Sequence, residues 1–120
     1  MQRKTVIFIA DSLDNAHRFQ QVLSRMDVDV VAGSSLQFKK LLAAHPDRDL
    51  VIFEARDDTA ASVAQAEAQL QEEGSCSMLI IVNESQLATF RLPVQIKADF
   101  VVQGSSPAEI GARIRQLLWP

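Results

Sequence analysis

Acidic and amide side chains follow three of the short apolar runs in this sequence. Asp11, Glu54 and Asn83 each stand directly after such a run. Two carboxylates brought together would offer the hard oxygen ligands that Mg²⁺ prefers. Only Asp11 and Glu54 qualify, however, and two carboxylates without a third anchor are a weak metal signal. The favoured interpretation is therefore a polar, solvated rim, and no metal site is predicted.

The other reactive residue types do not form a catalytic arrangement. Ala10–Asp14 contains no glycine, which disfavours a phosphate-binding loop after the first run. His17 and His45 fall in predicted helices and are expected at the surface. Cys76 is the only cysteine and is expected to be a half-buried structural thiol. The sequence therefore predicts no enzyme activity, no cofactor and no small-molecule substrate.

Short apolar runs recur along the chain. Most of them are rich in β-branched residues and unbroken by charge, which is typical of strands buried on both faces of a sheet. The predicted strands are Val6–Ala10, Val28–Ala32, Leu50–Phe53, Met78–Val82 and Phe100–Val102.

Longer segments with apolar residues at helical spacing lie between these runs. The clearest are Asp14–Met26, Ser35–His45, Thr59–Glu73 and a last one that begins at Pro107.

Capping residues mark the ends of these helices. Asp14 is expected to cap the first helix, Ser106 to cap the last, and Gly74 to end the helix before it. The segment Glu84–Lys97 is split by Pro93, which leaves room only for short helical turns. It is counted as the fourth helical segment.

Five strands alternating with five helical segments predict an α/β fold. The expected architecture is a doubly wound, five-stranded parallel sheet flanked by helices, with right-handed crossovers. In such folds the functional crevice lies outside the carboxyl ends of the strands. Asp11, Glu54, Asn83 and Gln103 are therefore expected to meet at that edge.

The length and the net charge of the chain restrict the classes of function that it can have. The chain has 120 residues, which predicts one domain over 1–120, and a formal net charge of −3. An acidic domain is not expected to grip DNA or RNA by itself. Its apolar runs are far too short to span a membrane. A single cysteine fits a cytoplasmic location.

Two stretches carry a family resemblance. Asp49–Glu54 and Phe100–Arg115 resemble the third strand and the C-terminal strand, loop and helix of bacterial response-regulator receiver domains. The resemblance extends along the whole chain and implies the (βα)5 flavodoxin/CheY-like fold. The second stretch is similar to receivers of the OmpR type.

The resemblance also exposes systematic departures. Glu54 replaces the phosphoacceptor aspartate, and Ala10 replaces the first acid after the first strand, which leaves Asp11. Asn83 replaces the Thr or Ser switch residue that follows the fourth strand in receivers. Gln103 replaces the invariant lysine that follows the fifth strand. The pocket of Asp11, Glu54, Arg56, Asn83 and Gln103 is therefore expected to be degenerate, and the domain to be a pseudo-receiver.

The role of Arg56 has two interpretations of equal weight. Residues two apart on an extended strand project to the same side, so Arg56 can pair with Glu54 and hold an active-like charge pattern. Alternatively, Arg56 is solvated in the loop.

Glu54–Asp58 and Pro107–Arg113 are similar to atypical receivers of the GlnR-like type. That resemblance implies an orphan regulator that dimerises without phosphorylation and contacts DNA only through a downstream winged-helix domain. The chain would then be the N-terminal part of a longer transcription factor, with a linker after Pro120. The alternative is a stand-alone pseudo-receiver adaptor that docks to a kinase or another signalling protein.

The OmpR-type resemblance implies a homodimer interface formed by the fourth helix, the fifth strand and the last helix. By analogy, Arg91 would pair with Glu109, and Asp99 with Arg113, across a two-fold axis. The expected interface residues are Arg91, Leu92, Val94, Asp99, Glu109, Ile110, Arg113 and Arg115.

Overall fold

The computed structural model describes residues 3–56, 58–74 and 76–120. Their strands pair in parallel in the order β2-β1-β3-β4-β5, which confirms the predicted sheet. The strand bounds are Lys4–Ile9 for β1, Val28–Gly33 for β2, Leu50–Glu54 for β3, Ser77–Val82 for β4 and Ala98–Val102 for β5.

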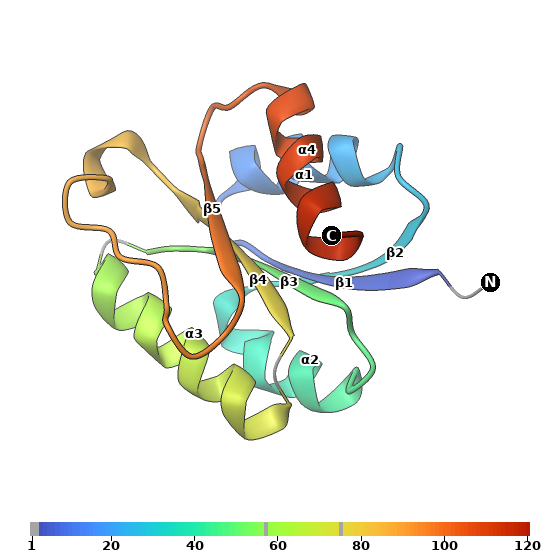
Figure 1. The fold of residues 1–120 in the computed structure, drawn as a ribbon, viewed down its shortest axis with the longest axis horizontal. Coiled ribbons are helices and arrows are strands. Elements are labelled where there is room, and N and C mark those ends of the chain that lie inside the picture. The colour runs from blue at the N-terminus through green and yellow to red at the C-terminus, as the bar shows by residue number, and fades with distance from the viewer. Residues whose placement is uncertain (1–2, 57, 75) are drawn as a thin grey trace.

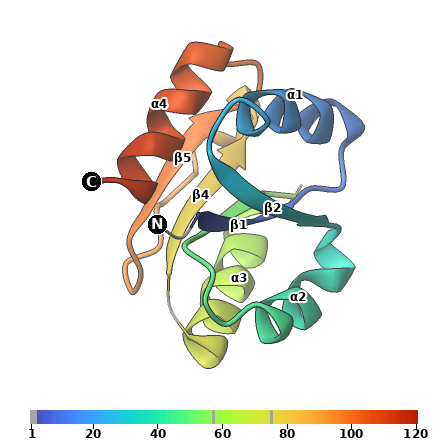
Figure 2. The same cartoon turned by 90° about the vertical axis from the view of Figure 1, so that its right-hand side faces the viewer.

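Four α-helices are present in the described residues, and they cover both faces of the sheet. Figures 1 and 2 show α1 and α4 on one face and α2 and α3 on the other. The bounds are Leu13–Leu23 for α1, Phe38–Ala44 for α2, Thr59–Glu73 for α3 and Pro107–Leu118 for α4. Two 3-10 turns add to them, η1 over Ser35–Gln37 and η2 over Glu84–Gln86. None of these helices is long and apolar enough to cross a membrane.

The central strands are buried on both faces. Val6 and Phe8 of β1 belong to the core under α1 and α4, where Phe8 stacks on Phe19 with ring centroids 5.7 Å apart. Ile7 and Ile9 belong to the core under α2 and α3. Alternate residues of one strand thus fill opposite cores, as an uncharged apolar run predicts.

The crossover from β4 to β5 departs from the regular alternation. Between residues 83 and 97 the structure forms only η2 and irregular chain. Pro93 cannot donate a helical hydrogen bond. Phe90 and Ile96 pack instead against the core under α2 and α3, and the Phe90 ring lies 5.4 Å from that of Phe100. Short turns are therefore confirmed here, but the fourth helix of the expected dimer face is wrong.

The helix ends match the predicted caps in part. The prediction that Asp14 caps the first helix is wrong, because Ser12 is the N-cap and accepts from the Asn15 backbone N–H. Ser106 caps α4 as predicted, by accepting from the backbone N–H of Glu109. Gly74 ends α3 with φ +109°, a left-handed conformation that glycine adopts without strain.

Candidate functional site

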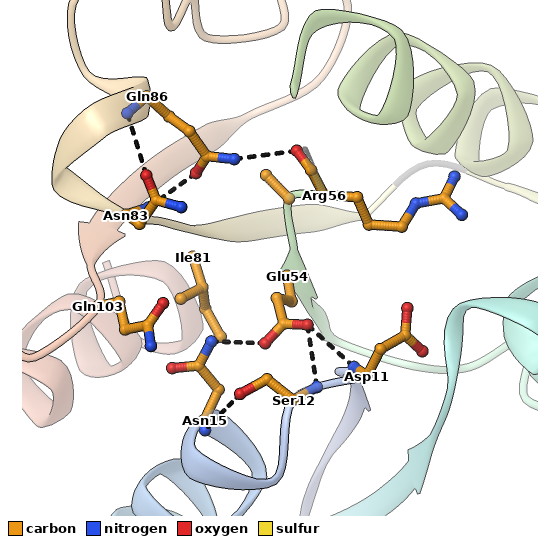
Figure 3. A pocket seen from close by; sticks show the side chains of 10 residues that line it. Asp11, Ser12, Asn15, Glu54, Arg56, Ile81, Asn83, Gln86 and Gln103 are labelled. Atoms are coloured by element: carbon orange, nitrogen blue, oxygen red, sulfur yellow. Dashed lines mark hydrogen bonds between the residues drawn. The ribbon is translucent and has the colours of Figure 1, made fainter. Parts of the chain in front are cut away.

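An open crevice of about 450 Å³ lies at the carboxyl ends of the central strands (Figure 3). The strand-end residues of β1, β3, β4 and β5 meet there because the strands are parallel. The crevice is lined by Asp11, Ser12, Asn15, Glu54, Ala55, Arg56, Ile81, Asn83, Gln86 and Gln103.

Glu54 is held by the loop that follows β1. Its Oε1 accepts from the backbone N–H groups of Asp11 at 3.0 Å and Ser12 at 3.1 Å. Its Oε2 accepts from the side-chain amide of Asn15, which is only 2% exposed. The carboxylate therefore lies beside the N-terminus of α1, where the helix dipole favours negative charge. Both carboxylate oxygens of Glu54 are thus hydrogen bonded.

Asp11 serves a different loop. Its Oδ1 accepts from the backbone N–H of Ser35 at 3.0 Å, which ties the end of β1 to the chain after β2. In Figure 3 its carboxylate points away from that of Glu54. The described residues hold no group of three or more His, Cys, Asp and Glu side chains suited to a metal ion. The two acids thus act as acceptors for backbone amides.

Arg56 reaches away from Glu54. Its exposed side chain points out of the crevice in Figure 3. No ion pair joins Arg56 to Glu54 among the residues that the structure describes. Its backbone carbonyl accepts from the side-chain amide of Gln86 at 2.9 Å. This geometry favours the solvated interpretation, and the backbone of Arg56, not its guanidinium, contributes to the site.

Asn83 and Gln86 form a reciprocal capping box at η2. The Asn83 Oδ1 accepts from the Gln86 backbone N–H at 3.1 Å, and the Gln86 Oε1 accepts from the Asn83 backbone N–H at 2.7 Å. Gln86 is buried and donates its remaining amide to the Arg56 carbonyl. Asn83 is therefore linked through Gln86 to the loop that follows β3.

Gln103 follows β5 at the edge of the crevice. Its backbone N–H donates to the Val82 carbonyl at 2.6 Å, and its neutral side chain lines the crevice. Gly104 comes next with φ +93°. Proline fixes φ near −65°, so the loop has a conformation at Gly104 that proline cannot adopt.

Sequence reasoning missed Ser12, Asn15 and Gln86. Gln86 carried a signal, because Asn83-Glu84-Ser85-Gln86 has the spacing of a capping box. Asn15 carried none, since its role depends on the approach of Glu54 from a strand far away in the sequence.

Cys76 lies outside the crevice, half-buried as predicted. Burial raises the pKa of its thiol, and the neighbouring Arg48 guanidinium opposes that shift.

Two residues of the expected dimer interface lie elsewhere. Ile110 is fully buried in the core under α1 and α4, so its place in an interface is wrong. Arg115 lines a groove between α1 and α4, on another side of α4 from Arg113. Arg115 is two residues from Arg113, and residues two apart on a helix point to different sides, whereas Ile110 points into the core between α4 and the sheet.

One of the two expected charge pairs, Asp99 with Arg113, is formed within one chain. Arg113 contacts Asp99 at 3.1 Å and Glu109 at 4.0 Å. Asp99 and Arg113 are therefore already paired with each other in the single chain. Arg91, Leu92 and Val94 are exposed, as an interface requires.

Comparisons with known proteins agree with the fold. The model of the family described as transcription regulator GlnR, N-terminal domain, matches residues 6–118. A search of curated proteins finds no match.

Solved receiver domains have the same fold. A response regulator receiver domain protein from Bacillus halodurans C-125 has TM-score 0.77 and 18% identity over 96% of this chain and 97% of that one. The signal receiver domain of an HD domain-containing protein from Pseudomonas fluorescens Pf-5 has TM-score 0.74 and 20% identity over 98% and 95%. NtrX from Brucella abortus has TM-score 0.68 and 16% identity over 98% of this chain and 27% of that one. Since the family match spans nearly the whole chain, this protein belongs to the family of GlnR transcription regulator N-terminal domains.

Proposed function

We propose that this domain is a pseudo-receiver, a regulatory module that works without phosphorylation and is not an enzyme. The family is one of transcription regulator domains, and the fold is that of receivers. The observation that carries the proposal is the hydrogen bonding of Glu54. Both of its oxygens accept N–H donors from the loop after β1 and from α1.

This arrangement opposes phosphoryl transfer in two ways. An attacking oxygen must reach the phosphorus in line, and small displacements are costly. The longer Glu54 side chain directs its oxygens at Asp11 and Ser12 instead. Gln103 also cannot supply the positive charge that would stabilise a phosphoryl group. The crevice is therefore suited to holding one fixed arrangement of its loops.

Treatment with acetyl phosphate and Mg²⁺, followed by intact-mass measurement, tests the proposal. We expect no phosphoryl adduct, while a phosphorylatable receiver treated in parallel gains one. The Glu54→Gln variant is the matched control, because it locates any adduct. A stoichiometric adduct that disappears in Glu54→Gln would overturn the proposal.

We further propose that the domain forms a homodimer and reaches DNA through a downstream winged-helix domain, in the cytoplasm. The family description as an N-terminal domain of a transcription regulator supports a longer protein. The net charge of −3 supports DNA contacts made elsewhere. The proposed dimer face comprises the irregular segment 87–97, β5 and the side of α4 that carries Arg113. Leu92 and Val94 are 41% and 86% exposed on it, which supplies apolar contact area.

A further inference from the structure

A second groove lies between α1 and α4. Figure 2 shows these two helices on the same face of the sheet. The volume of the groove is about 380 Å³. None of its lining residues belongs to the strand-end crevice. The groove is lined by Gln21, Val22, Arg25, Met26, Pro107, Ala108, Gly111 and Arg115.

The floor of this groove is apolar and largely buried, because Val22 and Gly111 are buried and Met26 is half-buried. Val22 and Met26 contribute side chains from the α1 side, while α4 contributes Ala108 and Gly111. A Cβ on Gly111 would lie 3.7 Å from the Val22 Cγ1 and 3.2 Å from the Arg115 Nη1, so the glycine keeps the space between the helices open. Methionine adapts its shape to different partners. A floor of this kind accommodates an apolar stripe of another element.

The charged residues at the groove are both positive. Arg25 and Arg115 are exposed, and no carboxylate lines the groove. Neither arginine takes part in an ion pair among the described residues. In a chain with net charge −3, this local excess of positive charge favours an acidic partner.

Trp119 extends the same surface at the end of α4. It is 48% exposed and shares a shallow hollow with Arg115 and Gln116. Tryptophan and arginine are the residue types that most often dominate binding energy at protein interfaces. This combination favours a protein segment over a small anion.

We infer that the α1/α4 groove docks an amphipathic helix of a partner protein, with an apolar stripe flanked by Asp and Glu. The stripe would lie on Val22, Met26 and Gly111, and its acidic flanks would meet Arg25 and Arg115. Recognition of a helix in a groove needs such anchors about one turn apart. The inference does not depend on the proposed function, because the groove is separate from both the strand-end crevice and the proposed dimer face.

A designed peptide tests this docking on the intact chain. The probe is a helical peptide of about 14 residues, close to the length of α1 and α4, with leucine along one face and glutamate elsewhere. Binding is measured by calorimetry and by the emission of Trp119, the only tryptophan. We expect saturable binding and a blue shift, whereas the same peptide with lysine in place of glutamate does not bind.

Two charge-matched double variants decide whether the groove is responsible. Arg25→Glu with Arg115→Glu is expected to weaken binding by at least about tenfold. Lys39→Glu with Lys40→Glu changes the net charge equally on α2, across the sheet, and is expected to bind like the wild type. Circular dichroism checks that both variants are folded.

Three results would overturn the inference. The first is no binding of the acidic peptide up to about 1 mM. The second is equal weakening in both double variants, which would indicate general charge attraction. The third is self-association of the wild type that disappears in the Arg25→Glu, Arg115→Glu variant, which would make a second copy the occupant.

Discussion

The carboxylate of Glu54 accepts hydrogen bonds that a shorter aspartate side chain would reach less readily. One extra methylene brings it to the backbone amides of Asp11 and Ser12 and to the side chain of Asn15. Hydrogen bonds to a charged acceptor are stronger than those between neutral groups. At the residue scale, Glu54 therefore fixes the loop between β1 and α1.

Neutralising Glu54 is therefore expected to destabilise the fold. Glu54→Gln should lower the free energy of unfolding by about 1–3 kcal/mol, because the amide loses charge-assisted bonds. Arg56→Gln, the control, should change it by less than about 0.5 kcal/mol, since its side chain is solvated. Urea unfolding of both single variants and the double variant measures these values. Non-additive effects in the double variant would reveal a Glu54–Arg56 interaction that the structure does not contain.

Residue types in the crevice were predictable from the sequence, but contacts between distant residues were not. The identity of Glu54, Asn83 and Gln103 predicted a degenerate pocket, because by the receiver resemblance they stand in place of an aspartate, a hydroxyl and an amine. The hydrogen bond from Asn15 to Glu54 joins α1 to β3, residues 39 apart in the sequence. No local pattern encodes that approach, since it depends on how strands β1 and β3 pair.

At the element scale, the uniform segments and the short turns around Pro93 were predictable from the sequence, whereas the fourth helix implied by the family resemblance was not formed. The helix over Thr59–Glu73 has the predicted bounds, because its sequence is free of breakers and ends at Gly74. The last helix begins at Pro107 as predicted. Between β4 and β5, family resemblance suggested a helix, whereas Pro93 and the packing of Phe90 produce irregular chain. The conformation of that segment therefore depends on its packing against the core.

The 3-10 turn η2 joins two loops through Gln86. The buried amide bonds to the backbone of Asn83 on one side and of Arg56 on the other. Gln86→Ala should therefore lower the free energy of unfolding by about 1–3 kcal/mol, because buried backbone groups lose their partners. Amide hydrogen exchange should also quicken in both loops.

The matched control is Ser85→Ala in the same turn. Ser85 is exposed and donates only to the Asn83 side chain, so its loss should cost less than about 0.5 kcal/mol. Equal losses in the two variants, or faster exchange confined to η2, would contradict a link between the loops.

At the scale of the whole molecule, three separate surfaces differ in their chemical character. The strand-end crevice holds fixed hydrogen bonds, the α1/α4 groove presents positive charge, and the segment 87–97 exposes apolar side chains. The intramolecular contact of Asp99 with Arg113 removes one of the charge pairs that the family analogy assigned across the dimer axis. In the proposed dimer, apolar contacts must then supply most of the binding, because exposed ion pairs contribute little.

This distribution predicts which substitutions separate the dimer. The wild type should sediment as a dimer at high micromolar concentration, and Leu92→Glu with Val94→Glu should sediment as a monomer. Placing two carboxylates on each copy of a two-fold interface brings like charges together and removes apolar area. The control is Leu36→Glu, because Leu36 is 94% exposed in η1, away from that face. A monomeric wild type would contradict the proposed dimer. A dimer that survives Leu92→Glu with Val94→Glu but not Leu36→Glu would show that the copies meet through another surface.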